Sequence, residues 1–212
     1  MTRSAYLRPP WTDLERQRQA AMLGMWIFLG SEVLLFSGLF DGYGVYRGLY
    51  PQGFLAAGRH TDIVLGTINT ALLMTSSGTI ATAGRAARAG WQRLAWWLLI
   101  ATFALGALFL ALKGLEYRKD IADHLVPGKT FAIVVPGAQL FFSFYWIMTG
   151  IHALHVSGGL AAVGRLIVTS RKDLAWLAGG GSEEATALYW HLVDIIWIIL
   201  YPLLYLVGRA HG

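Results

Sequence analysis

Five long apolar runs constrain this chain more than any other feature of its sequence. They lie near residues 20–40, 62–84, 94–114, 138–166 and 187–208. About 20 apolar residues form a helix long enough to cross a bilayer, so each run predicts one transmembrane helix. The sequence therefore predicts an all-α, polytopic membrane protein built as a bundle of five transmembrane helices.

The composition agrees with a membrane protein and excludes several other classes. Of the 212 residues, 56% are hydrophobic and 14% are charged, whereas about a quarter of the residues in soluble domains are charged. The segments between the runs are short, so we expect a single membrane domain over residues 1–212 with a polar tail at 1–19. The net charge of +5 is spread over these short segments, which argues against nucleic-acid binding. Without cysteine, the chain has no disulfide, thiolate metal site or iron–sulfur cluster.

The connecting segments also predict an orientation. An odd number of spans places the two termini on opposite sides of the membrane. The segment between the second and third runs contains Arg85, Arg88 and Arg93 and no acidic residue. Because basic loops stay in the cytoplasm, we expect a cytoplasmic N-terminus and an outside C-terminus. The tail lacks the charged-then-apolar order of a cleaved signal peptide.

Glu32 is the most unusual ionisable residue, because it lies near the middle of the apolar stretch "MWIFLGSEVLLFSGLF". A charge at the centre of a membrane helix costs about 2.5–3.5 kcal/mol on insertion scales. The residues three or four positions away are Phe28, Leu29, Leu35 and Phe36, so its own helix supplies no partner. Desolvation favours the neutral acid, which makes Glu32 a candidate proton-handling group.

Five more ionisable residues lie within the spans or at their edges, namely Glu116, His152, His155, His191 and Asp194. His152 and His155 are three residues apart, as are His191 and Asp194, so each pair shares one helix face. A metal or haem site is one interpretation, but such a site needs three or four converging ligands. A proton-coupled transporter is another, but the internal repeats and broken helices typical of transporters are missing. We favour buried interhelical pairs, His191 with Asp194 and either His152 or His155 with Glu116. No metal site and no catalytic residue is predicted.

Five motifs, one in each span or at its edge, resemble a known family. In order along the chain they are "SEVLLFSGLF" (31–40), "INTALLMTSS" (68–77), "LKGLEY" (112–117), "TGIHALHVSGG" (149–159) and "YWHLVDIIWIILYPLLY" (189–205). Together they resemble subunit III of the haem-copper oxidases, the cytochrome c and quinol oxidases. The last two motifs are the most specific of the five.

The resemblance implies a role that spacing alone does not show. It implies subunit III of a bacterial terminal oxidase of the cytochrome c oxidase type, in the cytoplasmic (inner) membrane. Such a subunit holds no cofactor; it packs against catalytic subunit I, which carries haem and copper, and supports proton uptake during reduction of oxygen to water. The family's buried glutamate falls on Glu32, where it is linked to proton handling. Glu116, His152, His155, His191 and Asp194 match other polar positions in the motifs.

Two related alternatives remain open from the sequence. A quinol oxidase subunit III and an accessory subunit of a nitric oxide reductase system share the same core motifs. Longer family members have two further spans before the first one seen here, and the cleft that those spans form holds ordered phospholipid. A bound phospholipid is therefore expected only if another subunit supplies the missing pair of helices.

Overall fold

The computed structural model describes residues 13–171 and 182–209, and the described part contains helices and no strand. The elements in chain order are α1 (Leu14–Leu49), α2 (Pro51–Gly58), α3 (Ile63–Arg88), α4 (Gln92–Ala122), α5 (Ala138–Ser170), α7 (Ser182–Tyr201) and the π-helical turn η2 (Pro202–Leu206). Five helices in the described ranges are long and apolar enough to cross a membrane. The all-α architecture and the five spans are therefore confirmed.

Two of the helices extend well beyond the apolar runs that predict them. The first run ends near residue 40, but α1 continues to Leu49 and ends just before Pro51, the first residue of α2. The third run ends near residue 114, but α4 continues to Ala122. Lys113 lies at the end of this run, and the additional turns of α4 contain Glu116 and Asp120; all three side chains are buried. Charged residues that suggest a loop in the sequence thus belong to a helix whose inner face they occupy.

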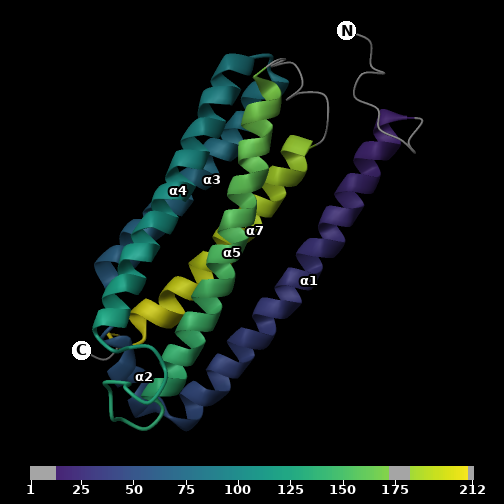
Figure 1. The fold of residues 1–212 in the computed structure, drawn as a ribbon. Helices are drawn as coiled ribbons and strands as arrows, with labels where there is room; N and C mark the ends of the chain where they lie inside the picture. Colours follow the sequence, from purple (N-terminus) through teal and green to yellow (C-terminus); the bar gives the residue numbers. More distant parts are fainter. Residues whose placement is uncertain (1–12, 172–181, 210–212) are drawn as a thin grey trace.

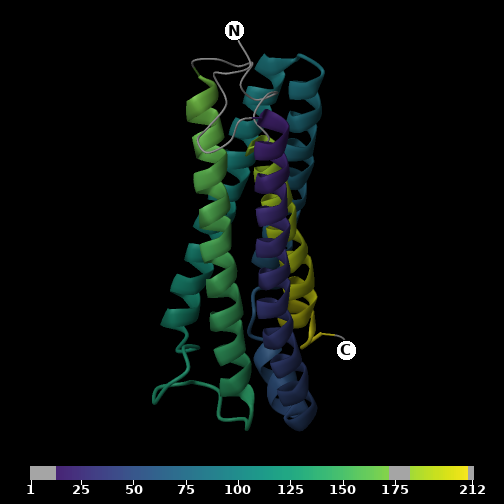
Figure 2. The same cartoon turned by 90° about the vertical axis from the view of Figure 1, so that its right-hand side faces the viewer.

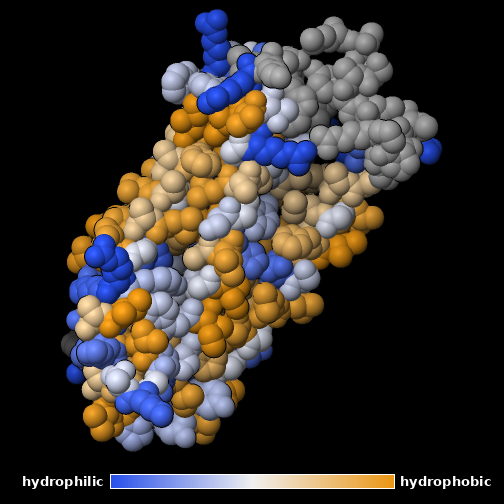
Figure 3. All heavy atoms as spheres, viewed as in Figure 1, coloured by the Kyte–Doolittle hydropathy of each residue, from blue (hydrophilic) through white to orange (hydrophobic). Residues whose placement is uncertain are grey.

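The helices are arranged as a compact group with one outlying member (Figure 1). Helices α3 and α4 form an antiparallel hairpin joined through Gly90, which has a positive φ of 84°. Helices α5 and α7 pack against this hairpin, whereas α1 stands apart over its N-terminal half (Figure 1). In the view turned by 90°, α1 lies in front of the other helices (Figure 2). In the face shown in Figure 3, hydrophobic residues dominate the middle, and strongly hydrophilic residues gather towards the two ends.

Helix α1 contacts the rest of the bundle through a narrow stripe. Its buried side chains are Leu29, Phe36 and Tyr43, spaced seven residues apart as in the contact seam of a coiled coil. Glu32 lies three residues after Leu29 and four before Phe36, so it belongs to the same stripe. The opposite face is open, with Leu34 75% and Ile27 67% exposed.

Trp190 of α7 joins three other helices at the centre of the compact group. Its indole Nε1 donates a hydrogen bond to the Ser76 hydroxyl of α3 at 3.0 Å. The ring lies against Gly106 of α4 and Gly159 of α5, where added Cβ atoms would lie 2.6 and 2.8 Å from it. Only glycine leaves room for the indole at these two positions.

We therefore predict that Gly106→Ala destabilises the bundle. The added methyl group overlaps the Trp190 ring, and overpacking of this kind costs about 1–3 kcal/mol. Thermal unfolding of the detergent-purified chain, followed by circular dichroism, should show a midpoint lowered by several degrees. The matched control is Gly114→Ala on the same helix, where nothing lies within 4 Å of an added Cβ and alanine favours the helix. Equal midpoints for the two variants would contradict this packing.

Candidate functional site

Glu32 has a partner on another helix, and that partner is His155. The Nε2 atom of His155 on α5 lies 2.7 Å from Oε2 of Glu32 on α1. The His155 and Glu32 side chains are 15% and 13% exposed, so the pair is partly covered but not sealed. The expectation that His155 or His152 pairs with Glu116 is wrong, because α1 is the helix that packs on this side of α5.

The hydrogen bonds of His155 show how many protons the pair holds. Its Nδ1 lies 2.8 Å from the carbonyl oxygen of Ile151, and because a carbonyl only accepts, Nδ1 carries a hydrogen. The contact between Nε2 and Glu32 then contains one further proton. The pair is either imidazolium with carboxylate or imidazole with carboxylic acid, and its net charge is zero in both forms. A neutral pair explains how a membrane helix tolerates Glu32.

Aromatic residues from two helices contact His155. The Tyr189 hydroxyl of α7 donates a hydrogen bond to the backbone carbonyl of His155 at 2.9 Å. Phe36 of α1 meets the imidazole edge-on, with ring centroids 5.6 Å apart. The site is therefore assembled from α1, α5 and α7, and a proton can be held at one stated position, between His155 Nε2 and Glu32 Oε2.

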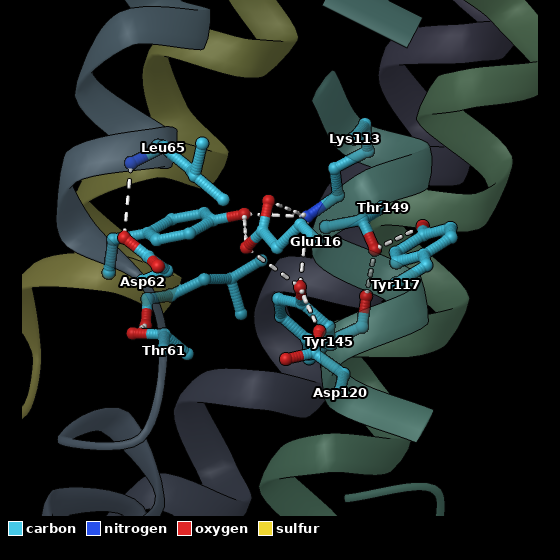
Figure 4. Close-up of polar contacts among 12 residues, drawn as sticks. Thr61, Asp62, Leu65, Lys113, Glu116, Tyr117, Asp120, Tyr145 and Thr149 are labelled. Carbon is cyan, nitrogen blue, oxygen red and sulfur yellow. Dashed lines mark hydrogen bonds and ion pairs between the residues drawn. The ribbon is translucent and has the colours of Figure 1, made fainter. Parts of the chain in front are cut away.

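Glu116 belongs to a second, deeply buried cluster at the opposite end of α4 from its junction with α3 (Figure 4). Lys113 Nζ donates to Glu116 Oε2 at 3.1 Å, to the Tyr145 hydroxyl at 3.0 Å and to the Tyr205 hydroxyl at 2.6 Å. The Tyr205 hydroxyl donates to Glu116 Oε1 at 2.8 Å. The Tyr145 hydroxyl lies 2.9 Å from Glu116 Oε1 and 2.8 Å from Asp120 Oδ2. We call these five residues the lysine cluster.

Aromatic rings enclose the ammonium group of the lysine cluster. Lys113 Nζ lies 4.5 Å from the ring centroid of Tyr145, 5.0 Å from that of Tyr117 and 5.3 Å from that of Tyr205. Such cation–π contacts strengthen when water is excluded. The Lys113 side chain is 2% exposed and that of Glu116 1%, so the ion pair is buried inside the bundle. All three ammonium hydrogens of Lys113 form hydrogen bonds.

A surface ion pair lies close to the lysine cluster, at the start of α3. Lys119 Nζ donates to Asp62 Oδ2 at 2.9 Å, and the Lys119 side chain is 57% exposed. This hydrogen bond holds the pKa of the Asp62 carboxyl below its ordinary value. Asp62 also caps α3, because its side chain accepts from the backbone N–H of Leu65 (Figure 4). Lys119 is thus occupied by Asp62 and points away from the interior.

His191 and Asp194 share a helix face but do not bond to each other as we expected. His191 Nδ1 instead pairs with the Ser77 hydroxyl of α3 at 2.8 Å, because α3 packs along this face of α7. Neither Asp194 oxygen has a hydrogen-bond partner among the described residues.

His152 also differs from expectation. It is fully buried, and neither ring nitrogen has a hydrogen-bond partner in the part of the chain that the structure describes. Its imidazole packs between aromatic rings instead, with centroids 5.1 Å from Trp197 and 5.7 Å from Phe109. Glu116 lies level with Tyr145, about two turns along α5 from His152, which removes it as a partner.

Sequence reasoning missed four members of the lysine cluster, namely Lys113, Asp120, Tyr145 and Tyr205. A usable signal exists, because Lys113, Glu116 and Asp120 are spaced by three and four residues and share one face of a helix.

Within the described residues, no group of three or more His, Cys, Asp or Glu side chains converges as metal ligands would. The two arrangements found, the Glu32–His155 pair and the lysine cluster, are suited to holding protons and balancing charge.

Comparison with known proteins identifies the family. The family model described as cytochrome c oxidase subunit III matches residues 16–209. Cytochrome c oxidase subunit 3 of Thermostichus vulcanus is 35% identical over 194 residues, covering 89% of this chain and 88% of that protein. The Bacillus subtilis protein of the same name is 30% identical over 189 residues, covering 89% and 86%.

A quinol oxidase subunit is also similar. Cytochrome bo(3) ubiquinol oxidase subunit 3 of Pseudomonas aeruginosa is 29% identical over 194 residues, covering 88% of this chain and 85% of that protein. The five membrane-spanning helices and the match over nearly the whole described length lead to one conclusion. The chain belongs to the cytochrome c oxidase subunit III family, whose members are subunits of terminal oxidases.

Proposed function

We propose that this chain is subunit III of a bacterial haem-copper terminal oxidase of the cytochrome c oxidase type. The observation that carries the proposal is the family match over residues 16–209, together with relatives of that name in several bacteria. In the proposed role the chain lies in the cytoplasmic membrane with its N-terminus in the cytoplasm. It packs against catalytic subunit I and stabilises it while oxygen is reduced.

The proposal assigns no cofactor and no catalytic step to the chain itself. In this proposal haem and copper belong to subunit I, and several buried polar groups of this chain bond to one another. The ammonium group of Lys113 and the carboxylate of Glu116 satisfy each other, His191 bonds to Ser77, and His152 packs between rings. We assign Glu116, His152, His191 and Asp194 to internal structure.

Glu32 and His155 are the proposed proton-linked residues. The pair holds one proton in its contact and has no net charge. Loss of that proton, or gain of a second one, leaves one charge in a partly covered site. Transfer of the proton between Oε2 and Nε2 requires only a small displacement at a separation of 2.7 Å. A group of this kind beside subunit I supports proton uptake without holding a redox centre.

A phospholipid is the one small molecule that we propose for this chain. A groove between α1, α3 and α7 is lined by apolar Met22 and Ile80 and by charged Arg85, Arg88, Glu183 and Glu184, and Arg88 is ion-paired with both glutamates. Arg85 is the groove cation left for a phosphate-bearing headgroup beside an acyl chain, and this site requires that another subunit complete the cleft.

A quinol oxidase is the second candidate, and the Pseudomonas aeruginosa relative favours it. The electron donor docks on other subunits, so the choice between cytochrome c and quinol depends on the partners of this chain.

Affinity purification tests the accessory role. We expect the full chain, tagged at its C-terminus and extracted from native membranes in mild detergent, to bring down a large haem-copper subunit identified by mass spectrometry. The identity of that subunit separates an oxygen-reducing oxidase from a nitric oxide reductase. Recovery of the chain alone with a haem spectrum of its own would contradict the proposal.

Glu32→Gln tests the proton-linked role. The amide keeps a hydrogen bond to His155 but cannot gain or lose a proton. We therefore expect normal assembly and haem content, with slower proton uptake and inactivation after several-fold fewer turnovers, measured as oxygen consumption by the purified complex over time.

The matched control is Ser31→Ala, which removes an exposed neighbouring hydroxyl bonded only to the Phe28 carbonyl of its own helix. It should leave oxygen consumption unchanged. Loss of the haem-bearing subunit from the Glu32→Gln complex would show that Glu32 has a structural role instead.

A further inference from the structure

The lysine cluster contains more close polar contacts than its hydrogens can fill. Six contacts of 2.6–3.1 Å join its five side chains. The ammonium group of Lys113 supplies three hydrogens, and the hydroxyl groups of Tyr145 and Tyr205 supply one each. The Tyr145 hydroxyl lies within 2.9 Å of two carboxylate oxygens but can direct its hydrogen at only one of them. One further hydrogen is required.

We propose that Asp120 binds this proton, which makes the lysine cluster a proton-binding site separate from the Glu32–His155 pair. The Asp120 carboxyl, neutral when protonated, donates to the Tyr145 oxygen, and Tyr145 in turn donates to Glu116. All six contacts then contain a hydrogen. The proton comes from hydronium in the solvent: one of its O–H bonds breaks, the O–H bond of the Asp120 carboxylic acid forms, and water is left.

Charge balance places the proton on Asp120 and not on Glu116. Glu116 receives a direct hydrogen bond from Lys113 at 3.1 Å and another from Tyr205 at 2.8 Å, and hydrogen bonds of this kind stabilise a carboxylate. Asp120 contacts only the Tyr145 hydroxyl in the cluster. With both acids ionised, the buried cluster would carry an uncompensated negative charge, which is costly at this depth.

The charged groups around Asp120 do not remove the need for a proton. On α4, Asp120 is near two lysines. Lys113 is already paired with Glu116, and Lys119 donates to Asp62 at the start of α3 and interacts with Asp120 only through its more distant charge. From α5 and η2 it faces the neutral hydroxyls of Tyr145 and Tyr205. Asp120 is 4% exposed and lies in the last turn of α4, so the proton is held just inside the bundle end.

Infrared spectroscopy of the purified full chain tests the proposal directly. At neutral pH, the spectrum of the parent chain minus that of Asp120→Asn should contain one carbonyl band of a neutral carboxylic acid. The matched control is Asp123→Asn, which removes an exposed carboxylate one turn away and should leave that band in place. An unchanged band in Asp120→Asn would overturn the proposal, and its loss in Glu116→Gln alone would place the proton on Glu116.

Thermal unfolding supplies a second readout that does not depend on the band. An amide mimics a neutral acid, so Asp120→Asn should shift the midpoint by no more than about 4 °C, while Glu116→Gln removes the carboxylate that accepts directly from Lys113 and Tyr205 and should lower it by about 10 °C. If Asp120→Asn lowered the midpoint as much as Glu116→Gln, its negative charge would be required and the proposal would fail.

Discussion

The structure depends on one constraint, which is that ionisable groups inside a membrane bundle must form sets with no net charge. Lipid offers neither water nor counterions, so an unpaired buried charge costs several kcal/mol. The Glu32–His155 pair meets the constraint with a single shared proton. The lysine cluster meets it with a lysine, a carboxylate and three hydroxyl or acid groups that use every ammonium hydrogen.

The same constraint determines how α1 attaches to the rest of the bundle. Most of α1 is exposed, and its buried contacts follow the stripe of Leu29, Phe36 and Tyr43. Since lipid is as apolar as these side chains, apolar contact alone gives little drive for association in a membrane. The hydrogen bond between Glu32 and His155 adds a polar contact within the stripe, and Tyr43 adds another by donating to the Leu203 carbonyl. Glu32, the proposed proton-linked residue, is therefore also a positioning contact for its helix.

The sequence predicts the number of spans and their type, because hydrophobic length alone determines which segments cross a bilayer. It does not predict which polar residues meet, because that depends on which helices become neighbours. His155 could be expected to pair with any acid, and only the packing of α1 on α5 selects Glu32. By hydropathy, Lys113 marks the end of the third span. In the structure α4 continues to Ala122, and the Lys113 side chain is buried inside the bundle. The stretch around Glu32 is apolar on every face of the helix, so only the burial of Leu29 and Phe36 shows which face meets α5.

The two polar arrangements that we propose as proton-binding sites lie at different levels of α5. Tyr145 and His155 are ten residues apart, about 15 Å along the helix. The one ionisable side chain of α5 between them is His152, which has no hydrogen-bond partner among the described residues and is packed against Trp197 and Phe109. Among the described residues, the side-chain hydrogen bonds of the lysine cluster do not continue along α5 to His155, because the imidazole of His152 is packed between aromatic rings. The lysine cluster and the Glu32–His155 pair are therefore two separate polar arrangements in the described part of the bundle, each balancing its own charge.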